Sequence, residues 1–545
     1  MTVEKLITDH IDIWSSALQT RSTAGRGSSG KIDLYGIKKL RELILELAVR
    51  GKLVPQDPND EPASELLKRI AAEKAELVKQ GKIKKQKPLP EISEDEKPFE
   101  LPEGWEWTSL NEIALINPKI EVTNDEQEIS FVPMPCISTR FDGTHDQEIK
   151  KWGEVKKGYT HFADGDIALA KITPCFENSK AVIFEGLKNG VGVGTTELHV
   201  ARPLSSELNL QYILLNIKAP HYLTIGELQM TGSAGQKRVP RSFFENYPIP
   251  FPPKTEQARI VETFSELMSL CDQLEQQSLT SLEAHQQLVE TLLATLTDSQ
   301  NEKELSENWS RINQHFDTLF TTEASIDALK QTILQLAVMG LLIENAEFSQ
   351  RSHLKKHLSF GPRNGLSPSE VKYETDVKVL KLGATSYGYL KLQETKYVDI
   401  DTSDKLHLFL RKGDILIQRG NSSNFVGCSL LIEKDFDNLI YPDLMMKIRT
   451  KDELFPEYAA LWLSSPFARN YMWSKMTGTS GTMPKISKKV VEDVPIAVPP
   501  LAVQHQLVIK IKKIFFLCDS LKSRLQLAQQ TQLHLADALT DAALN

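Results

Sequence analysis

Two long stretches with the same apolar spacing constrain the fold more than any other feature of this sequence. The first covers residues 257–298 and the second residues 501–545, and each follows a proline-rich segment that ends in Pro-Pro. Their apolar or small residues recur mostly at steps of three and four: Ile260, Phe264, Leu267, Cys271, Leu274, Leu282, Leu288 and Leu292, then Leu507, Ile511, Ile514, Cys518, Leu521, Leu525, Ala528, Leu535, Leu539 and Ala542. This spacing is typical of a coiled-coil seam, so we expect two long helices.

The chain repeats itself around these helices. Aligning the two Pro-Pro pairs matches Gln257 with Gln504, Cys271 with Cys518, Asp272 with Asp519 and Leu274 with Leu521. Before each α/β region, residues 37–53 match residues 326–342. Within the α/β regions, the matches are Gly165-Asp166 with Gly413-Asp414, Tyr212 with Tyr458, Pro220 with Pro466, and Met230-Thr-Gly-Ser with Met476-Thr-Gly-Thr. We therefore expect one unit used twice, made of a helix, an α/β domain and a long helix.

The length of 545 residues exceeds the ~250–300 residues that one core usually supports, so several domains are expected. We predict an N-terminal helical region with a charged linker (1–100), a first α/β domain called head 1 (101–253), a central helical spacer (254–345), a second α/β domain called head 2 (346–500) and a C-terminal long helix (501–545). The predicted fold class is α+β, a tandem pseudo-two-fold repeat of two mixed α/β domains separated by long antiparallel coiled-coil helices.

Within these regions, apolar periodicity and turn residues suggest individual elements. We expect helices at 3–19, at 31–50 with Gly51 as C-cap, from Ser64 as N-cap to about Gln80, and across 302–342. Strand-like runs are 129–132, 166–172 and 181–184 in head 1, and 377–382, 414–418 and 429–432 in head 2; each head also has a helix, at 210–216 and 458–464. Residues 21–30 and 82–100 have the composition of flexible links.

Composition narrows the class of protein. The net charge of −8 argues against a chain that binds polyanions over its whole surface, although a local basic face is compatible with it. The five cysteines are scattered without paired spacing, which favours a reducing compartment over a disulfide framework or a zinc site. No signal peptide and no apolar run of about 18 residues is evident, so we expect a cytoplasmic protein without a membrane span.

Catalytic motifs are missing from the sequence. There is neither a phosphate-binding Gly-x-x-x-x-Gly-Lys loop nor a His-Glu-x-x-His zinc motif, nor an Asn-Pro-Pro-aromatic motif of amino-methyltransferases. Glycine-rich residues 189–194 are interpreted as a turn or a site of close packing, and Pro442-Asp443 as structural. We therefore predict no catalytic residue, no metal site and no cofactor in this chain.

The start Leu101-Pro-Glu-Gly-Trp105, the Pro-Pro-x-x-x-Gln exits from both heads and the duplicated layout resemble the specificity subunits of type I restriction–modification enzymes. The resemblance covers nearly the whole chain, although head 2 lacks the Leu-Pro-x-Gly-Trp start. It implies two target-recognition domains, each for one half of a split DNA sequence. It also implies helices that hold two methyltransferase subunits, with S-adenosylmethionine, ATP and Mg bound by these and by restriction subunits.

Candidate DNA-binding residues lie in loops that recur in both heads. Arg suits guanine and Asn or Gln suits adenine, while Lys and small residues near free backbone N–H groups suit phosphates. In head 1 the candidates are Lys171, Thr173, Asn178, Lys180, Ser233, Gly235, Gln236, Lys237 and Arg238, with Thr139 and Arg140 as weaker ones. In head 2 they are Arg419, Asn421, Ser422, Asn424, Thr479, Ser480 and Lys485, with Arg363, Asn364, Thr385, Ser386 and Tyr387 as weaker ones. The same loops are compatible with plain glycine turns.

Two functions from different classes remain at this point. The first is a non-catalytic reader of a two-part DNA site, in which the heads contact the bases and the helices set the gap between the two parts. The second is an assembly scaffold whose heads bind protein. A steep salt dependence of duplex binding favours the first, because neutralised phosphates release counterions.

Overall fold

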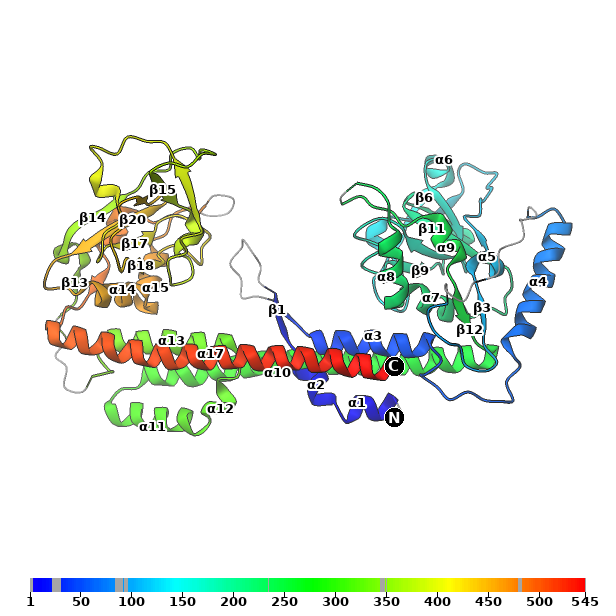
Figure 1. The fold of residues 1–545 in the computed structure, drawn as a ribbon, viewed down its shortest axis with the longest axis horizontal. Helices are drawn as coiled ribbons and strands as arrows, with labels where there is room; N and C mark the ends of the chain where they lie inside the picture. Colours follow the sequence, from blue (N-terminus) through cyan, green and yellow to red (C-terminus); the bar gives the residue numbers. More distant parts are fainter. Residues whose placement is uncertain are drawn as a thin grey trace. The chain divides into compact units, whose positions relative to one another are not determined.

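The computed structural model describes residues 3–21, 31–83, 92, 97–233, 235–343, 348, 350–478 and 483–544 (Figure 1). The chain divides into two compact units. Unit 1 contains residues 1–17, 34–277 and 532–545, and unit 2 contains residues 18–33 and 278–531. Head 1 lies in unit 1 and head 2 in unit 2. No helix in the described ranges has the length and apolar character needed to cross a membrane.

The helices of unit 1 precede and follow head 1. They are α1 (Val3–Thr8), α2 (Ile11–Ser16), α3 (Tyr35–Val49), α4 (Ala63–Lys79) and the first part of α10 (Lys254–Asp298), joined by the end of α17 (Leu501–Leu544). The predicted helix at 3–19 is wrong in extent, because it breaks into α1 and α2. The helix predicted at 31–50 begins at Tyr35, since residues 31–33 form strand β2 (Lys31–Asp33) with β1 (Gln19–Arg21). Ser64 is not the N-cap of α4, because Pro62 holds that position.

Head 1 is built from two four-stranded sheets. The first has the order β4 (Ala114–Ile116), β11 (Leu198–Pro203), β8 (Ile167–Ala170) and β9 (Ala181–Ile183), all antiparallel. The second has the order β6 (Glu148–Lys151), β5 (Glu128–Val132), β10 (Val191–Gly194) and β7 (Thr160–Ala163), with β5 and β10 parallel. A ribbon of β3 (Glu106–Thr108) and β12 (Ile249–Phe251) joins the domain's two ends, and its helices are α5 (Leu110–Ile113), α6 (Trp152–Val155), α7 (Leu210–Lys218), α8 (Pro220–Gln229) and α9 (Arg241–Asn246).

Head 2 repeats this plan. Its first sheet has the order β14 (Leu358–Asn364), β20 (Met445–Thr450), β17 (Ile415–Gln418) and β18 (Ser429–Leu431). Its second has three strands, β16 (Thr395–Val398), β15 (Val377–Leu380) and β19 (Leu439–Ile440), with β15 and β19 parallel. The ribbon is β13 (Ser352–His353) with β21 (Pro495–Ile496), and the helices are α14 (Pro456–Ser464), α15 (Pro466–Ser474) and α16 (Lys488–Glu492). The strands and helices predicted within both heads are thus confirmed.

Equivalent side chains hold equivalent turns in the two heads. Gly165 and Gly413 have positive φ angles of 83° and 87°, which glycine adopts without strain. The aspartate after each glycine accepts a hydrogen bond from the backbone N–H three residues before it, at 2.8 Å in both heads. The prediction that Gly-Asp makes the turn into a strand is therefore confirmed. The glycines of residues 189–194 also pack closely, because a Cβ on Gly192 would lie 2.3 Å from the ring of Phe162.

The exits to the long helices are equally matched. Gln257 and Gln504 are both fully buried, and each donates from Nε2 to the backbone carbonyl five residues before it, Pro252 O at 2.9 Å and Pro499 O at 2.7 Å. A cation of the preceding helix then pairs with the matched aspartate. Arg41 of α3 lies 2.5 Å from Asp272, and Lys330 of α13 pairs with Asp519. In each unit, therefore, an ion pair at matched positions joins the long helix to the helix that precedes the head.

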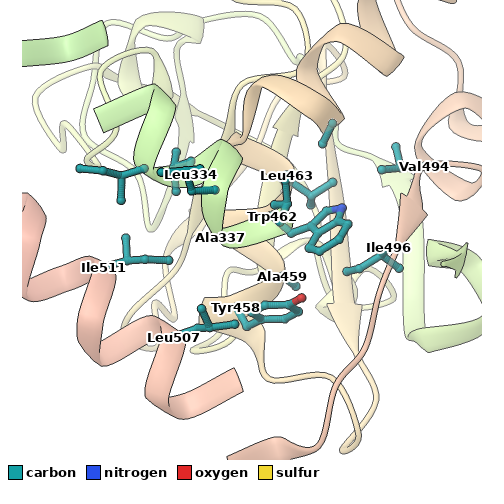
Figure 2. Close-up of a cluster of buried hydrophobic side chains, with 14 of the residues drawn as sticks. Leu334, Ala337, Tyr458, Ala459, Trp462, Leu463, Val494, Ile496, Leu507 and Ile511 are labelled. Atoms are coloured by element: carbon teal, nitrogen blue, oxygen red, sulfur yellow. The ribbon is translucent and has the colours of Figure 1, made fainter. Parts of the chain in front are cut away.

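The core of unit 2 is formed where α13 (Glu323–Val338) and α17 meet head 2. Figure 2 shows Leu334 and Ala337 from α13 and Leu507 and Ile511 from α17 around Trp462 and its neighbours in α14. Trp462 is 1% exposed, and its indole N–H donates to Pro495 O at 2.9 Å. This packing fixes α17 against the head, because the apolar faces of three helices share one cluster.

The predicted coiled-coil seam holds only for part of each long helix. Ile260, Phe264, Leu267 and Cys271 are buried as predicted, but Leu288 is 51% exposed and its neighbour Val289 is buried. From residue 278 onward α10 packs in unit 2 with Val289, Leu293 and Leu296 against the segment around Leu319 and Phe320. In α17, Leu535 is exposed and Ala536 is buried instead. The stretch predicted as one helix across 302–342 is α11 (Glu302–Gln314), α12 (Phe316–Leu319) and α13.

Candidate DNA interface

Two of the predicted loops meet in head 1. Residues 171–180 follow β8, and residues 231–233 and 235–238 follow α8. They are joined by backbone hydrogen bonds, from Val239 N to Lys171 O at 2.8 Å and from Thr173 N to Lys237 O at 3.0 Å. We call these two segments the first loop pair.

Head 2 joins the matching loops in the same way. Residues 419–424 follow β17, and Ile486 N donates to Arg419 O at 2.8 Å. Lys485 forms isolated β-bridges with Gly420 and Thr477. We call residues 419–424, 477–478 and 483–485 the second loop pair. The candidates Thr479 and Ser480 lie outside the described residues.

The shared hydrogen bond identifies which residues are equivalent. Val239 N to Lys171 O corresponds to Ile486 N to Arg419 O, so Lys171 corresponds to Arg419 and Arg238 to Lys485. The strand next to each loop agrees, because Lys171 N donates to Glu197 O and Arg419 N donates to Leu444 O, both at 2.9 Å. Each loop pair thus has a cation on both of its segments.

Several candidates of the first loop pair are exposed to solvent, namely Asn178, Ser233, Gly235, Gln236 and Lys237. Two others are used inside the protein. The Lys180 ammonium donates to Met134 O at 2.7 Å, and the Thr173 hydroxyl is buried without a partner in the described part of the chain. These two residues therefore shape the loop, and the exposed ones are better placed for a ligand.

A buried cation supports the first loop pair from behind. Lys218, at the end of α7, is 1% exposed and donates to Ser179 O at 2.8 Å. Ser179 has a positive φ of 56°, an uncommon conformation for a serine. Burial lowers the pKa of the Lys218 ammonium to about 7, with Asp142 opposing the shift. Lys218 is not recognisable from the sequence as a support of this loop, because a lysine at a helix end usually lies in solvent.

The second loop pair is supported by different residues. Arg469 of α15 donates from Nη2 to Asn424 O at 2.7 Å. Gln418, the last residue of β17, is buried and donates from Nε2 to Thr385 Oγ1 at 2.9 Å and to Ser386 Oγ at 3.0 Å. Its Oε1 accepts from Asn421 Nδ2 at 2.6 Å. Gln418 therefore links the loop after β17 to residues 382–386.

The hydrogen bonds of Gln418 involve three of the candidate DNA-binding residues. Thr385 is 2% exposed, so its side chain does not face solvent in this structure. The hydroxyl of Ser386 and the amide of Asn421 are engaged by Gln418. Ser422 N donates to Asn421 Oδ1 at 2.7 Å, which shapes the loop further. Their neighbour Tyr387 is exposed, and its ring lies 6.3 Å from that of Phe425 and 3.9 Å from the Lys391 ammonium.

The remaining candidates lie at two other places. Arg363 and Asn364 end β14, where Asn364 pairs with Met446, close to the Leu444 carbonyl that receives Arg419 N. Arg363 is exposed, whereas Asn364 Oδ1 is buried with no partner in the described residues.

The segment with Thr139 and Arg140 rests on the long helix of unit 1. Arg140 pairs with Asp142 at 3.1 Å, and Phe141 packs edge-on against Phe264 of α10. Arg140 also lines a cavity of about 860 Å³ bordered by α10 residues such as Met268. Thr139 and Arg140 are both exposed, and within the described residues no backbone hydrogen bond joins either of them to the first loop pair. The two therefore belong to the head–helix junction of unit 1.

Arg238 and Glu197 form an ion pair at the first loop pair. Arg238 donates from Nε and Nη2 to the two oxygens of Glu197, both at 2.8 Å. This pairing holds the pKa of the Glu197 carboxyl below its usual range. Leu444 stands at the equivalent place in head 2. In the described residues no group of His, Cys, Asp and Glu has the arrangement of a metal site.

Comparisons with known proteins agree on one family. The family model "Type I restriction modification DNA specificity domain" matches residues 102–284 and 363–528. The type I restriction enzyme EcoEI specificity subunit of Escherichia coli is 64% identical, and the EcoAI specificity subunit of Escherichia coli is 57% identical; both alignments cover 100% of this chain and 100% of the relative.

A solved chain from a study of complex assembly and conformational transition of the type I R-M system has a similar fold. It has a TM-score of 0.52 at 17% identity, covering 82% of this chain and 99% of that one. The duplicated heads, the matched loop pairs and the full-length similarity lead to one conclusion: this chain belongs to the family of DNA specificity subunits of type I restriction–modification systems.

Proposed function

We propose that this chain reads a two-part, asymmetric DNA sequence, with one loop pair for each part. The observation that carries the proposal is the conserved frame of the loop pairs: the same backbone hydrogen bond joins the same two loops in both heads, while the side chains on that frame differ. A common frame gives both heads the same way of approaching a duplex. Different side chains, such as Lys171 against Arg419, let them select different bases.

The polar side chains on the loops divide between two tasks; Asn178, Gln236, Lys237 and Lys485 are exposed, and Lys171 and Arg419 are half-buried. Lys171, Lys237 and Lys485 supply positive charge for phosphates, which gives affinity and register. Asn178, Gln236 and Arg419 have the donors and acceptors that pair with base edges in the major groove. The overall charge of −8 is compatible with this division, because phosphate contacts depend on the local charge of the loops and not on the charge of the whole chain.

We further propose that the chain assembles with two methyltransferase subunits and with restriction subunits in the cytoplasm. S-adenosylmethionine, ATP and Mg would then bind to those partners. Large apolar side chains on α17 support a protein partner, since Ile509, Phe516, Leu517 and Leu527 are each more than half exposed. A groove of about 790 Å³ between α11, α13 and α17, lined by Trp309, Leu517 and Leu521 among others, adds to that surface.

The test is a selection from random duplexes with the complex that co-purifies with the full chain. We expect two short enriched blocks separated by a fixed gap. Replacing residues 101–253 by the corresponding segment of a relative should change one block and leave the other intact. A change in both blocks would contradict the assignment of one head to each part.

A scaffold whose heads bind protein gives a different result. In that case a complex that still contains a methyltransferase enriches no sequence through this chain, and its duplex binding depends only weakly on salt. For the proposed reader, several neutralised phosphates give a steep decrease of affinity as salt rises.

A further inference from the structure

Arg238 is held in one orientation before any ligand is bound. Its Nε and Nη2 donate to the two oxygens of Glu197, both at 2.8 Å, and its Nη1 donates to Gln236 O at 3.1 Å. A bidentate arginine–carboxylate pair fixes the plane of the guanidinium as well as its position. The guanidinium is therefore pre-oriented at the first loop pair.

Part of this guanidinium remains available. An arginine has five N–H donors, and the contacts with Glu197 and Gln236 use three of them. One hydrogen on Nη1 and one on Nη2 remain, and no acceptor for them is found in the described residues. The side chain of Arg238 is 42% exposed, whereas that of Glu197 is 23% exposed. The exposed partner of the pair is thus the donor.

We infer that Arg238 reads a guanine in the part of the DNA site that head 1 contacts, and that Glu197 positions it for this task. This inference rests on the proposed function. The two remaining donors of Arg238 match O6 and N7 of guanine, which form a pair of acceptors on the major-groove edge. Glu197 selects the outward-facing donor edge and prevents the guanidinium from rotating.

Charge favours a base over a phosphate as the ligand. Glu197 neutralises Arg238 locally and brings a negative group close to the DNA, which weakens attraction to the backbone. The directional hydrogen bonds of the guanidinium are unaffected by this neutralisation. A phosphate contact would gain from a cation such as Lys485 in head 2, which has no ion pair with any described residue; Leu444 replaces the carboxylate there. The guanine assignment is accordingly limited to head 1.

The first test compares Arg238→Lys and Arg238→Ala with the wild type in the selection from random duplexes. Both variants should lose preference for guanine at one position of one block, by roughly 5- to 150-fold, the worth of a bidentate base contact. Every other position should keep its preference. If Arg238 contacts only a phosphate, the lysine variant stays close to wild type. The alanine variant then weakens all sequences alike and lowers the salt slope by about one.

The second test removes the carboxylate. Glu197→Gln should reduce guanine preference at that same position several-fold and should raise affinity for unrelated duplexes, because a repelling charge has gone. A merely structural role for Glu197 would lower both quantities together. The matched control is Glu245→Gln in the same head, where Glu245 accepts from Arg241 Nε at 2.8 Å in an ordinary helix pair. This control should leave every base preference unchanged.

The outcomes separate this inference from the proposed function. If the wild-type complex enriches no sequence, the proposed function fails. If the wild type enriches two blocks and Arg238→Lys keeps all of its preferences, only the assignment of Arg238 is overturned.

Discussion

The two heads share a backbone frame but hold their loops with different side chains. Head 1 supports its loop with Lys218 from α7, which donates to Ser179 O, and head 2 uses Arg469 from α15, which donates to Asn424 O. At the end of the matching strands, head 1 has Ala170 where head 2 has the hydrogen-bonding Gln418. The backbone hydrogen bonds that join the loops are thus the same in both heads, while the side chains that hold the loops differ. The loops of one head can therefore change without a change of fold.

The largest predicted difference concerns the buried aspartate of the Gly-Asp turn. Asp166 pairs with one cation, Arg202, at 2.8 Å. Asp414 pairs with two, Arg449 at 2.6 Å and Lys447 at 3.1 Å, and Lys447 is itself almost fully buried. Asp414→Asn should destabilise head 2 by about 3–5 kcal/mol, because it leaves a buried ammonium without its counter-charge. Asp166→Asn should destabilise head 1 by about 1–3 kcal/mol, because Arg202 can reach water.

Asparagine keeps one acceptor oxygen and loses the other in both heads, so the comparison between the two variants isolates the effect of the second cation. Urea unfolding gives the loss of free energy, and hydrogen exchange assigns it to β17 or β8. Equal losses in the two heads would show that Lys447 does not depend on Asp414.

Gln418 provides the next largest effect. Gln418→Ala should destabilise head 2 by about 2–4 kcal/mol, because it removes several hydrogen bonds and leaves buried polar groups without partners. Selection from random duplexes should then show weaker preferences in the block that head 2 reads. Thr385→Val is the control, since it removes one hydrogen bond of the network and should cost about 1 kcal/mol. A Gln418→Ala variant as stable as the control would show that the network does not hold the loops.

The sequence predicted the repeat and the frame of the heads well, for a physical reason. Buried turns and capped exits depend on particular residues, such as Gly165, Asp166 and Gln257, and these recur at matched positions. The long helices were less predictable. An apolar seam shows that a helix packs against a partner, but it does not show where along the helix that partner changes. In α10, Val289 is buried in place of Leu288 where the helix contacts the segment around Leu319.

The candidate site was predictable at the level of loops but not of side chains. Polar residues and glycines indicated that residues 171–180 and 419–424 lie outside helices and strands, as they do. The use of each side chain depends on neighbours that are distant in sequence. The buried Thr385 accepts a hydrogen bond from Gln418, and Arg238 is oriented by Glu197, which directly precedes β11. In the sequence, the sign of this ion pair is that the repeat places the acidic Glu197 of head 1 at the position of the apolar Leu444 in head 2.

We expect substitutions of the two loop-supporting residues, Arg469 and Lys218, to differ in how their effects on stability depend on pH. Arg469→Met should destabilise head 2 by about 1.5–3 kcal/mol, because it removes a charge-assisted hydrogen bond to Asn424 O. Lys218→Met should behave differently. The folded-state pKa of Lys218 lies near 7, below its unfolded value, so the folded protein binds fewer protons than the unfolded one above that pH.

The sign for Lys218 follows from this proton count. Keeping the buried ammonium charged weakens the wild type fully below pH 7, and this penalty decreases as pH rises from about 7 toward 10. Lys218→Met should therefore gain relative to wild type at pH 6 and lose more than half of that advantage by pH 9, as measured by thermal unfolding. A difference independent of pH would show that Lys218 is charged in the folded protein throughout this range.

The smallest predicted effect is one that the two heads should share. Tyr212 and Tyr458 occupy matched positions, are both buried, and donate to Pro250 O at 3.0 Å and to Ala497 O at 2.9 Å. Each bond ties a helix to the exit segment before a long helix, so it belongs to the frame. Tyr212→Phe and Tyr458→Phe should each cost about 1 kcal/mol, because each leaves one buried carbonyl with fewer donors. Urea unfolding of both variants and of the double variant should give additive losses, since the two sites share no partner. Unequal losses would mean that the exits, like the loop supports, have diverged between the heads.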